Sequence, residues 1–151
     1  MAEPDSLQQA IQAGVRLLAM REHSARELRA KLERSFEPPV VEAALEELRR
    51  QGLQSDQRFT EQYVHSRRNK GYGPLRIRAE LRERGIDEAT IDLRLEACEG
   101  DWRELMLRVA RRRFGSDPPK DRREMGRRGR FLTSRGFPSH LVNGYLFSQS
   151  E

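Results

Sequence analysis

The sequence predicts an all-α protein made of three tandem three-helix repeats that form an elongated, curved, solenoid-like array. Two observations support this class: apolar residues recur at spacings of three and four, and no segment alternates as a strand does. A third is that the same order of helices and glycines returns after about 50 residues. We place the repeats at residues 1–53, 54–100 and 101–151. Three short helices bury little by themselves, so neighbouring repeats must share apolar surface.

The first repeat is predicted to contain three helices. Its first helix shows an apolar stripe at helical spacing, formed by Leu7, Ile11, Val15 and Leu18. The second follows Ser24 and Glu27, whose spacing is that of a capping box. Pro38 and Pro39 fit only the first turn of a helix, so a third helix begins there and stops at Gly52.

The second repeat follows the same plan. Asp56 is expected to cap a first helix that ends near Gly71. Pro74 opens a second helix, which closes at Gly85, and Asp87 caps the third.

The third repeat is the least regular of the three. Its first helix is predicted from a stripe formed by Trp102, Leu105 and Val109. Asp121 and Glu124 resemble a helix start after the longer loop 114–120. Arg135-Gly136-Phe137 lies 51 residues after Arg84-Gly85-Ile86, which places it at the end of the second helix of this repeat.

Composition excludes several classes of protein. The longest apolar run, Leu17–Met20, is far shorter than the roughly 20 residues of a membrane span. One cysteine, Cys98, and three scattered histidines cannot form a four-ligand zinc site. We expect Cys98 to be buried and the histidines to be exposed or half-buried. No catalytic residues, metal or cofactor are predicted, and the absence of an apolar N-terminal segment favours the cytoplasm.

Charge is distributed unevenly along the chain. Lys and Arg number 29 against 24 Asp and Glu, and the whole excess of +5 comes from residues 101–151, which hold twelve basic and six acidic residues. All but three of the basic residues are arginines. A GC-rich coding sequence would explain that ratio, and so would recognition of phosphate or carboxylate groups by the planar guanidinium.

Two basic regions are candidate binding surfaces. The first surrounds Tyr72 and contains Arg67, Arg68, Lys70, Arg76, Arg78 and Arg82. It is either a solvated face with internal ion pairs or an anchor for a partner, since Tyr and Arg are enriched in interface hot spots. The Gly71–Pro74 segment within it lacks the Lys-Ser/Thr of a phosphate-binding loop, so we interpret it as a turn between helices.

The second basic region holds eight arginines within about 20 residues, which repel one another unless an acidic partner neutralises them. They are Arg111, Arg112, Arg113, Arg122, Arg123, Arg127, Arg128 and Arg130. A phosphate backbone and an acidic protein surface would both serve as that partner.

Several motifs resemble those of the RecX family of regulatory proteins. The central ones are Arg58-Phe59-Thr60, Tyr63-Val64, Arg67, Gly71-Tyr72-Gly73-Pro74, Ile77-Arg78-Ala79-Glu80-Leu81 and Gly85-Ile86. Ser24–Leu32 is similar to the family's first-unit pattern Ser-x-x-Glu-Leu-x-x-Lys-Leu, and Phe131-Leu132 with Arg135-Gly136-Phe137 is similar to its third-unit ending. Two departures are Ser35-Phe36, where a Gly-aromatic pair is usual, and the helix entry Glu37-Pro38-Pro39.

The resemblance implies three tandem three-helix units and a non-enzymatic modulator of the RecA recombinase. Members lie in the groove of the RecA filament on single-stranded DNA and inhibit ATP hydrolysis, strand exchange and coprotease activity. For this chain it implies the RecA filament and single-stranded DNA as partners, with double-stranded DNA as a further candidate. We expect a monomer with no membrane partner. Two other classes stay open: a DNA-binding module that acts without RecA, and a nuclease, for which no acidic pair is found.

Overall fold

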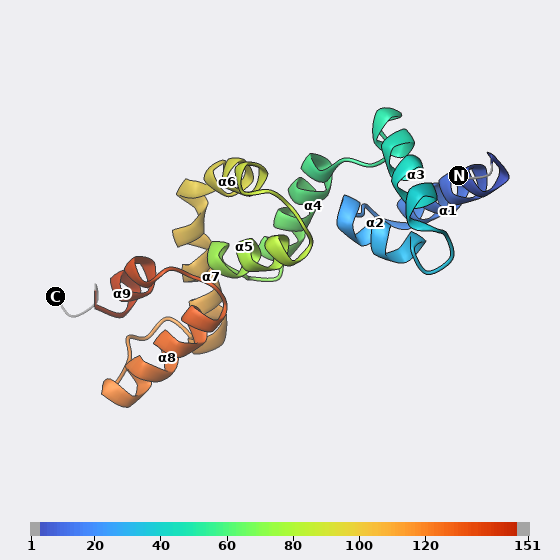
Figure 1. The fold of residues 1–151 in the computed structure, drawn as a ribbon. Coiled ribbons are helices and arrows are strands. Elements are labelled where there is room, and N and C mark those ends of the chain that lie inside the picture. Colours follow the sequence, from blue (N-terminus) through green and yellow to red (C-terminus); the bar gives the residue numbers. More distant parts are fainter. Residues whose placement is uncertain (1–3, 148–151) are drawn as a thin grey trace. The chain divides into compact units, whose positions relative to one another are not determined.

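The computed structural model describes residues 4–147, which form nine α-helices and one 3-10 turn and contain no strand (Figure 1). The first repeat consists of α1 (Pro4–Met20), α2 (Ala25–Leu32) and α3 (Pro38–Arg50). The second consists of α4 (Asp56–Asn69), α5 (Pro74–Glu83) and α6 (Glu88–Glu96). The turn η1 (Glu99–Asp101) leads into α7 (Trp102–Phe114), α8 (Arg122–Ser134) and α9 (Ser139–Phe147). The all-α class and the three successive three-helix repeats are therefore confirmed.

Side chains cap the helices mostly where the sequence predicts. Ser24 and Glu27 form a complete capping box, and the Asp121 carboxylate accepts from the backbone N–H of Glu124 at 2.8 Å. The prediction for α4 was wrong: the Ser55 hydroxyl caps this helix, accepting from the Arg58 N–H at 3.1 Å. Asp56 instead accepts from the N–H of Ala25 at 2.9 Å and so serves the start of α2.

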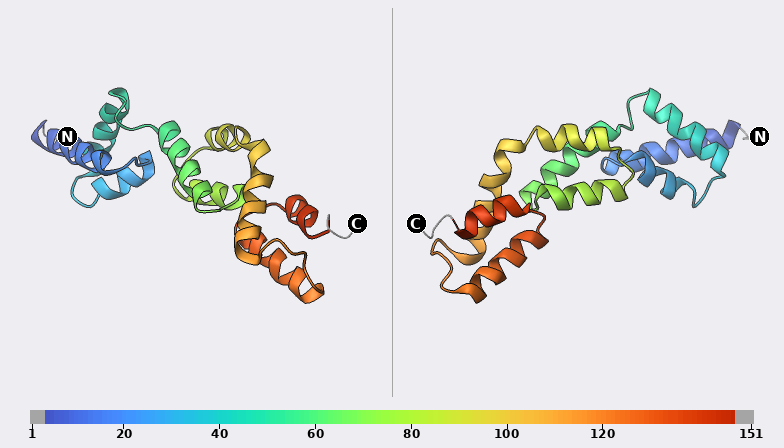
Figure 2. Two further views of the ribbon diagram at one scale, coloured as in Figure 1. Left: turned by 180° about the vertical axis from the view of Figure 1, so that it is seen from behind. Right: turned by 60° about the vertical axis from the view of Figure 1, so that its left-hand side comes forward.

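The core of the first repeat lies between α1, α2 and α3, which pack on one another (Figure 2). Its most buried members come from α2 and α3: Leu28, Leu32, Val41, Leu45 and Leu48. Three members of the predicted stripe of α1, Leu7, Ile11 and Leu18, pack against the core. Val15 does not, because it is 40% exposed, and Ala10 and Gly14 are buried instead. A Cβ added to Gly14 would lie 2.5 Å from Leu48 Cδ1, so this glycine permits close approach of α1 to α3.

The chain divides into two compact units that do not coincide with the three repeats. The N-terminal unit contains residues up to Gln62 together with Leu81–Thr90, and the C-terminal unit contains Tyr63–Glu80 together with the residues from Ile91 onward. Each unit thus combines one terminal repeat with part of the middle repeat. The repeat boundaries at residues 53 and 100 stay predictions.

Each unit contains one junction between successive repeats. In the C-terminal junction, the Gly73 N–H donates to the Arg135 carbonyl at 2.7 Å and the Leu75 N–H donates to the Gly136 carbonyl at 3.0 Å. A Cβ on Gly73 would lie 2.5 Å from the carbonyl oxygen of Gly136, so only glycine fits there. In the N-terminal junction the corresponding close approach is between Gly85 and the side chain of Arg26.

Candidate anion-binding cleft

Tyr72 lies at the centre of a group of arginines in the C-terminal unit. The guanidinium carbons of Arg67, Arg76 and Arg135 lie 3.9, 4.3 and 4.7 Å from the centre of its half-buried ring. Cation–π attraction at such distances contributes about 0.5–2 kcal/mol per contact. The Tyr72 ring therefore contacts arginines of its own chain, and its role as an anchor for a partner stays a prediction.

Glu80 neutralises part of this group. It accepts two hydrogen bonds from Arg67 at 2.8 Å, one from the Tyr63 hydroxyl at 2.9 Å and one from Arg76 at 3.3 Å. Burial favours the protonated acid, but the hydrogen bonds from Arg67, Tyr63 and Arg76 outweigh it and hold the pKa of Glu80 below its ordinary value. Arg67 is therefore an internal ion-pair partner with a side chain only 17% exposed.

Two further arginines of the first basic region form internal ion pairs. Arg78 pairs with Asp92 at 2.7 Å, and Arg82 pairs with Glu88. These two arginines thus match the interpretation of a face with internal ion pairs.

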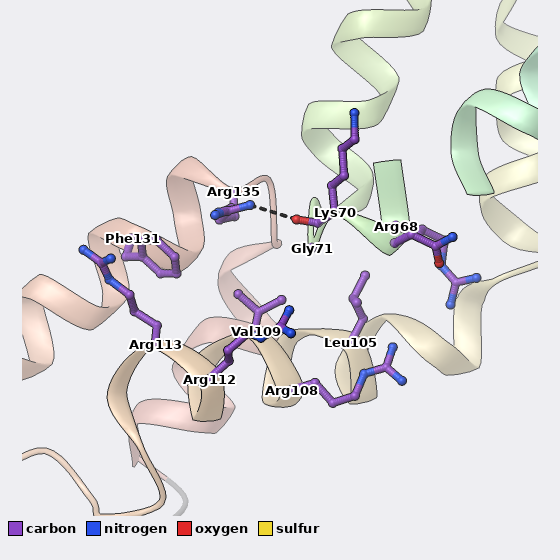
Figure 3. Close-up of a pocket in the computed structure, with 11 residues that line it drawn as sticks. Arg68, Lys70, Gly71, Leu105, Arg108, Val109, Arg112, Arg113, Phe131 and Arg135 are labelled. Carbon is purple, nitrogen blue, oxygen red and sulfur yellow. Dashed lines mark hydrogen bonds between the residues drawn. The ribbon is translucent and has the colours of Figure 1, made fainter. Parts of the chain in front are cut away.

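A cleft of about 690 Å³ opens in the C-terminal unit between the end of α4, one face of α7 and the end of α8 (Figure 3). Six of its eleven lining residues are basic and none is acidic: Arg68, Lys70, Arg108, Arg112, Arg113 and Arg135. The remaining lining residues are polar, glycine or apolar: Asn69, Gly71, Leu105, Val109 and Phe131. The cleft joins residues from both predicted basic regions.

Few acidic groups compensate the charge of the cleft. Arg68 lies 3.7 Å from Asp101, which does not line the cleft, and its guanidinium lies 5.1 Å from the centre of the Trp102 ring. Arg135 donates to the Lys70 carbonyl at 3.0 Å, a contact with a neutral group. Arg113 and Arg135 both lie over the Phe131 ring, at 5.1 and 5.2 Å. Six positive charges in one hollow therefore create a strong local field for anions.

Arg128 was predicted to be a binding residue, but it is only 2% exposed and cannot reach a partner. It donates to Glu124 at 2.7 Å, to the Tyr145 hydroxyl at 2.8 Å and to the Asp117 carbonyl at 2.9 Å. The N–H of Lys120 and the guanidinium of Arg128 hold the pKa of Glu124 below its ordinary value. Arg128 thus ties α8 to α9 and to the preceding loop.

The other arginines of the second basic region lie outside the cleft. Arg127 is 4.0 Å from Glu124, and Arg111 lines a smaller hollow beside Asp117 and Tyr145. Arg122, Arg123 and Arg130 are exposed on α8. The eight arginines do not form one surface, since only Arg112 and Arg113 line the cleft.

The sequence did not point to two of the six basic residues of the cleft, Arg108 and Arg135. Arg108 lies one helical turn before Arg112, a spacing that places both on one face of α7. Arg135 belongs to the Arg-Gly-Phe turn after α8, which served as a repeat and family motif and not as a binding candidate. The period of the helix and the position of Arg135 beside a repeated glycine are the signals that could have found them.

The histidine and cysteine predictions need one correction each. His23 is buried rather than exposed, with Nδ1 donating to the Arg21 carbonyl at 3.0 Å and Nε2 accepting from Lys31 at 2.8 Å. Burial lowers its pKa. Cys98 is half-buried rather than buried.

Residues 4–147 contain no cluster of three or more potential metal ligands and no helix long and apolar enough to cross a membrane.

Helical repeats and a basic cleft define a tandem three-helix-repeat protein with a surface suited to anionic groups. Three family models match in order along the chain: the first three-helix domain of RecX at residues 10–48, the second at 55–93 and the third at 101–146. The chain belongs to the RecX family.

Relatives and solved structures agree with this assignment. The chain is 43% identical over 131 residues to Regulatory protein RecX of Pseudomonas syringae pv. tomato, covering 86% of this chain and 84% of the relative. It is 44% identical to Regulatory protein RecX of Halorhodospira halophila, covering 100% and 95% of the two chains. A crystal structure of regulatory protein RecX matches with a TM-score of 0.81 at 28% identity, covering 93% of this chain and 73% of that one. RecX from Lactobacillus salivarius shares the fold, with a TM-score of 0.84 at 19% identity over 98% and 99% of the two chains.

Proposed function

We propose that this chain is a non-enzymatic, cytoplasmic regulator of the RecA recombinase. As a monomer it binds along the groove of the RecA filament on single-stranded DNA and inhibits ATP hydrolysis, strand exchange and coprotease activity. The observation that carries the proposal is the ordered match of all three RecX domains across the chain, with relatives at 43–44% identity that are named regulatory proteins.

Tandem repeats suit a periodic partner for a physical reason. Several weak contacts on one chain gain avidity when the partner repeats the same surface at a fixed spacing. Inhibition then needs no catalytic group, because binding one filament state more tightly shifts the population away from turnover.

The test is the rate of ATP hydrolysis by RecA on single-stranded DNA with substoichiometric amounts of this protein. We expect the rate to fall when the protein is far scarcer than RecA, because one bound molecule affects a filament of many protomers. An unchanged rate at equimolar protein would refute the proposal.

The basic cleft favours a second candidate, a sequence-nonspecific DNA-binding module that acts independently of RecA. This candidate predicts equal DNA binding with and without RecA and no effect on RecA ATP hydrolysis. The same ATPase titration, paired with a DNA-binding assay, separates the two.

A further inference from the structure

We propose that the basic cleft of the C-terminal unit binds the phosphodiester backbone of single-stranded nucleic acid, and that Phe131 at its wall contacts an unstacked base. The inference rests on the proposed function only for the choice of single-stranded DNA as the natural ligand. It assigns nucleic-acid contact to this cleft and not to the exposed face of α8.

Charge is the first argument for a phosphate ligand. The cleft carries six basic side chains and no lining carboxylate. On α8, by contrast, Glu124 accepts from Arg128 and lies 4.0 Å from Arg127, so an acid lies among those arginines. A ligand with several regularly spaced negative charges relieves repulsion in the cleft more than it does on α8.

The geometry of the cations also suits a chain of phosphates. They come from three separate segments: Arg68 and Lys70 from the end of α4 and its turn, three arginines from α7, and Arg135 from the turn after α8. Figure 3 shows these side chains pointing in different directions, with Lys70 extending along α4 away from α7. A single small anion would contact only some of these cations, whereas successive phosphates of a strand contact more of them.

The apolar wall argues for a single strand over a duplex. Leu105, Val109 and the half-buried Phe131 line the cleft together with the cations. A duplex presents phosphates and keeps its bases stacked inside, so it gains little from such a wall. Proteins that bind single strands combine a positive groove with aromatic rings on which bases stack, and guanidinium planes serve the same purpose.

The first test compares two double variants of the full chain that each remove two exposed arginines. Arg108→Gln with Arg112→Gln removes charge from the cleft, and Arg122→Gln with Arg123→Gln removes the same charge from α8. Binding of fluorescein-labelled oligothymidylate is measured by anisotropy between 50 and 200 mM salt, without RecA. We expect the cleft variant to lose about 30-fold in affinity and to lower the salt slope by about 1.4. We expect the control to lose less than about 3-fold. Equal losses, or no loss in the cleft variant, would overturn the proposal.

The second test concerns the aromatic wall. Phe131→Leu should weaken oligothymidylate binding about 5-fold with an unchanged salt slope, because a stacking surface is lost and no charge is. Phe131→Tyr keeps the ring and should bind as the unmodified protein does, which controls for packing around Phe114 and Phe131. Equal binding of a duplex of the same length, with no effect of Phe131→Leu on either ligand, would overturn the assignment to single strands.

RecA ATP hydrolysis, measured with the same variants, separates this inference from the proposed function. If the unmodified protein fails to inhibit RecA but binds DNA through the cleft, the proposed function fails and the cleft stands. If the cleft variant binds DNA normally while the unmodified protein inhibits RecA, the cleft fails and the proposed function stands.

Discussion

Both junctions between repeats bring a glycine into close contact with the neighbouring repeat, but they differ in electrostatics. In the N-terminal junction acids neutralise the arginines: Arg58 pairs with Glu22 at 2.6 Å and Arg84 lies 3.7 Å from Glu27. In the C-terminal junction the equivalent arginine is Arg135, which lies one repeat after Arg84. Its guanidinium lies over the ring of Tyr72 and donates a hydrogen bond to the Lys70 carbonyl.

The difference shows how one repeat junction keeps charged arginines that the other neutralises. A carboxylate partner cancels the charge of an arginine, whereas an aromatic ring or a backbone carbonyl fixes its position and leaves its charge. The C-terminal junction therefore holds its arginines in place without neutralising them all, and the cleft adjoins it through Arg135. The N-terminal junction, with paired charges, serves to connect repeats.

The largest effect is expected from Gly136→Ala, which tests whether the C-terminal junction depends on backbone contact. Gly136 has φ +100°, and an added Cβ would lie 2.6 Å from the backbone nitrogen of Arg76. Strain in the left-handed region and this overlap add, so the free energy of unfolding should fall by about 4 kcal/mol. Urea unfolding followed by fluorescence of Trp102, the single tryptophan of the chain, measures it in this unit.

Gly115→Ala is the matched control in the same unit. Gly115 also has a positive φ, +80°, but nothing lies within 4 Å of its added Cβ. The control should lose less, about 1–3 kcal/mol, because its φ of +80° and ψ of −169° are costly for alanine but no overlap is added. If the two variants lose equal stability, close contact between Gly136 and Arg76 contributes nothing to the junction.

The next largest effect is a difference in folding stability between two charge reversals. One is at Arg67, which is paired within the protein, and the other is at Lys70, which lines the cleft. Arg67→Glu places a second carboxylate beside Glu80 and should lower the free energy of unfolding by about 3 kcal/mol, because both side chains are less than one-fifth exposed. Lys70→Glu, on an exposed position that lines the cleft, should change stability by less than about 0.5 kcal/mol. It should nevertheless weaken inhibition of RecA ATP hydrolysis. Equal destabilisation by the two substitutions would show that Arg67 is not an internal partner.

Much of the fold could be predicted from the sequence because its signals are local. The capping box at Ser24 and the N-cap at Asp121 each involve residues within one turn, and both are confirmed. The cap of α4 was misassigned because Asp56 has a partner 31 residues away, at Ala25, which no local pattern shows.

The candidate site was less predictable, because charge alone does not tell an exposed arginine from a paired one. Arg128 is buried by Tyr145 and Asp117, and Arg67 is paired with Glu80 across 13 residues. Arg108 and Arg135 enter the cleft through packing of α7 beside the C-terminal junction, which periodicity does not specify. Identifying the cleft therefore required the tertiary structure.

The smallest effect is a difference between the two units in their response to acid. Burial lowers the pKa of His23 in the N-terminal unit, so the unfolded state binds a proton more readily than the folded state does. Stability of that unit is therefore full above about pH 7 and declines as the pH falls through about 6.5. In the C-terminal unit the pKa of Glu80 is lowered by Arg67, Tyr63 and Arg76 against the effect of burial, so the loss begins only near pH 4.

Urea unfolding between pH 8 and pH 4 tests this difference, with circular dichroism reporting both units and Trp102 fluorescence reporting the C-terminal one. We expect the helical signal to lose stability between pH 7 and pH 5.5 while the Trp102 transition stays constant, and His23→Gln to remove that early loss. Because Lys31 donates to Nε2 of His23, protonation of the ring also breaks this hydrogen bond and places two cations together. Parallel pH profiles for the two signals would show that His23 contributes no acid sensitivity of its own, and that the two units respond to pH as one.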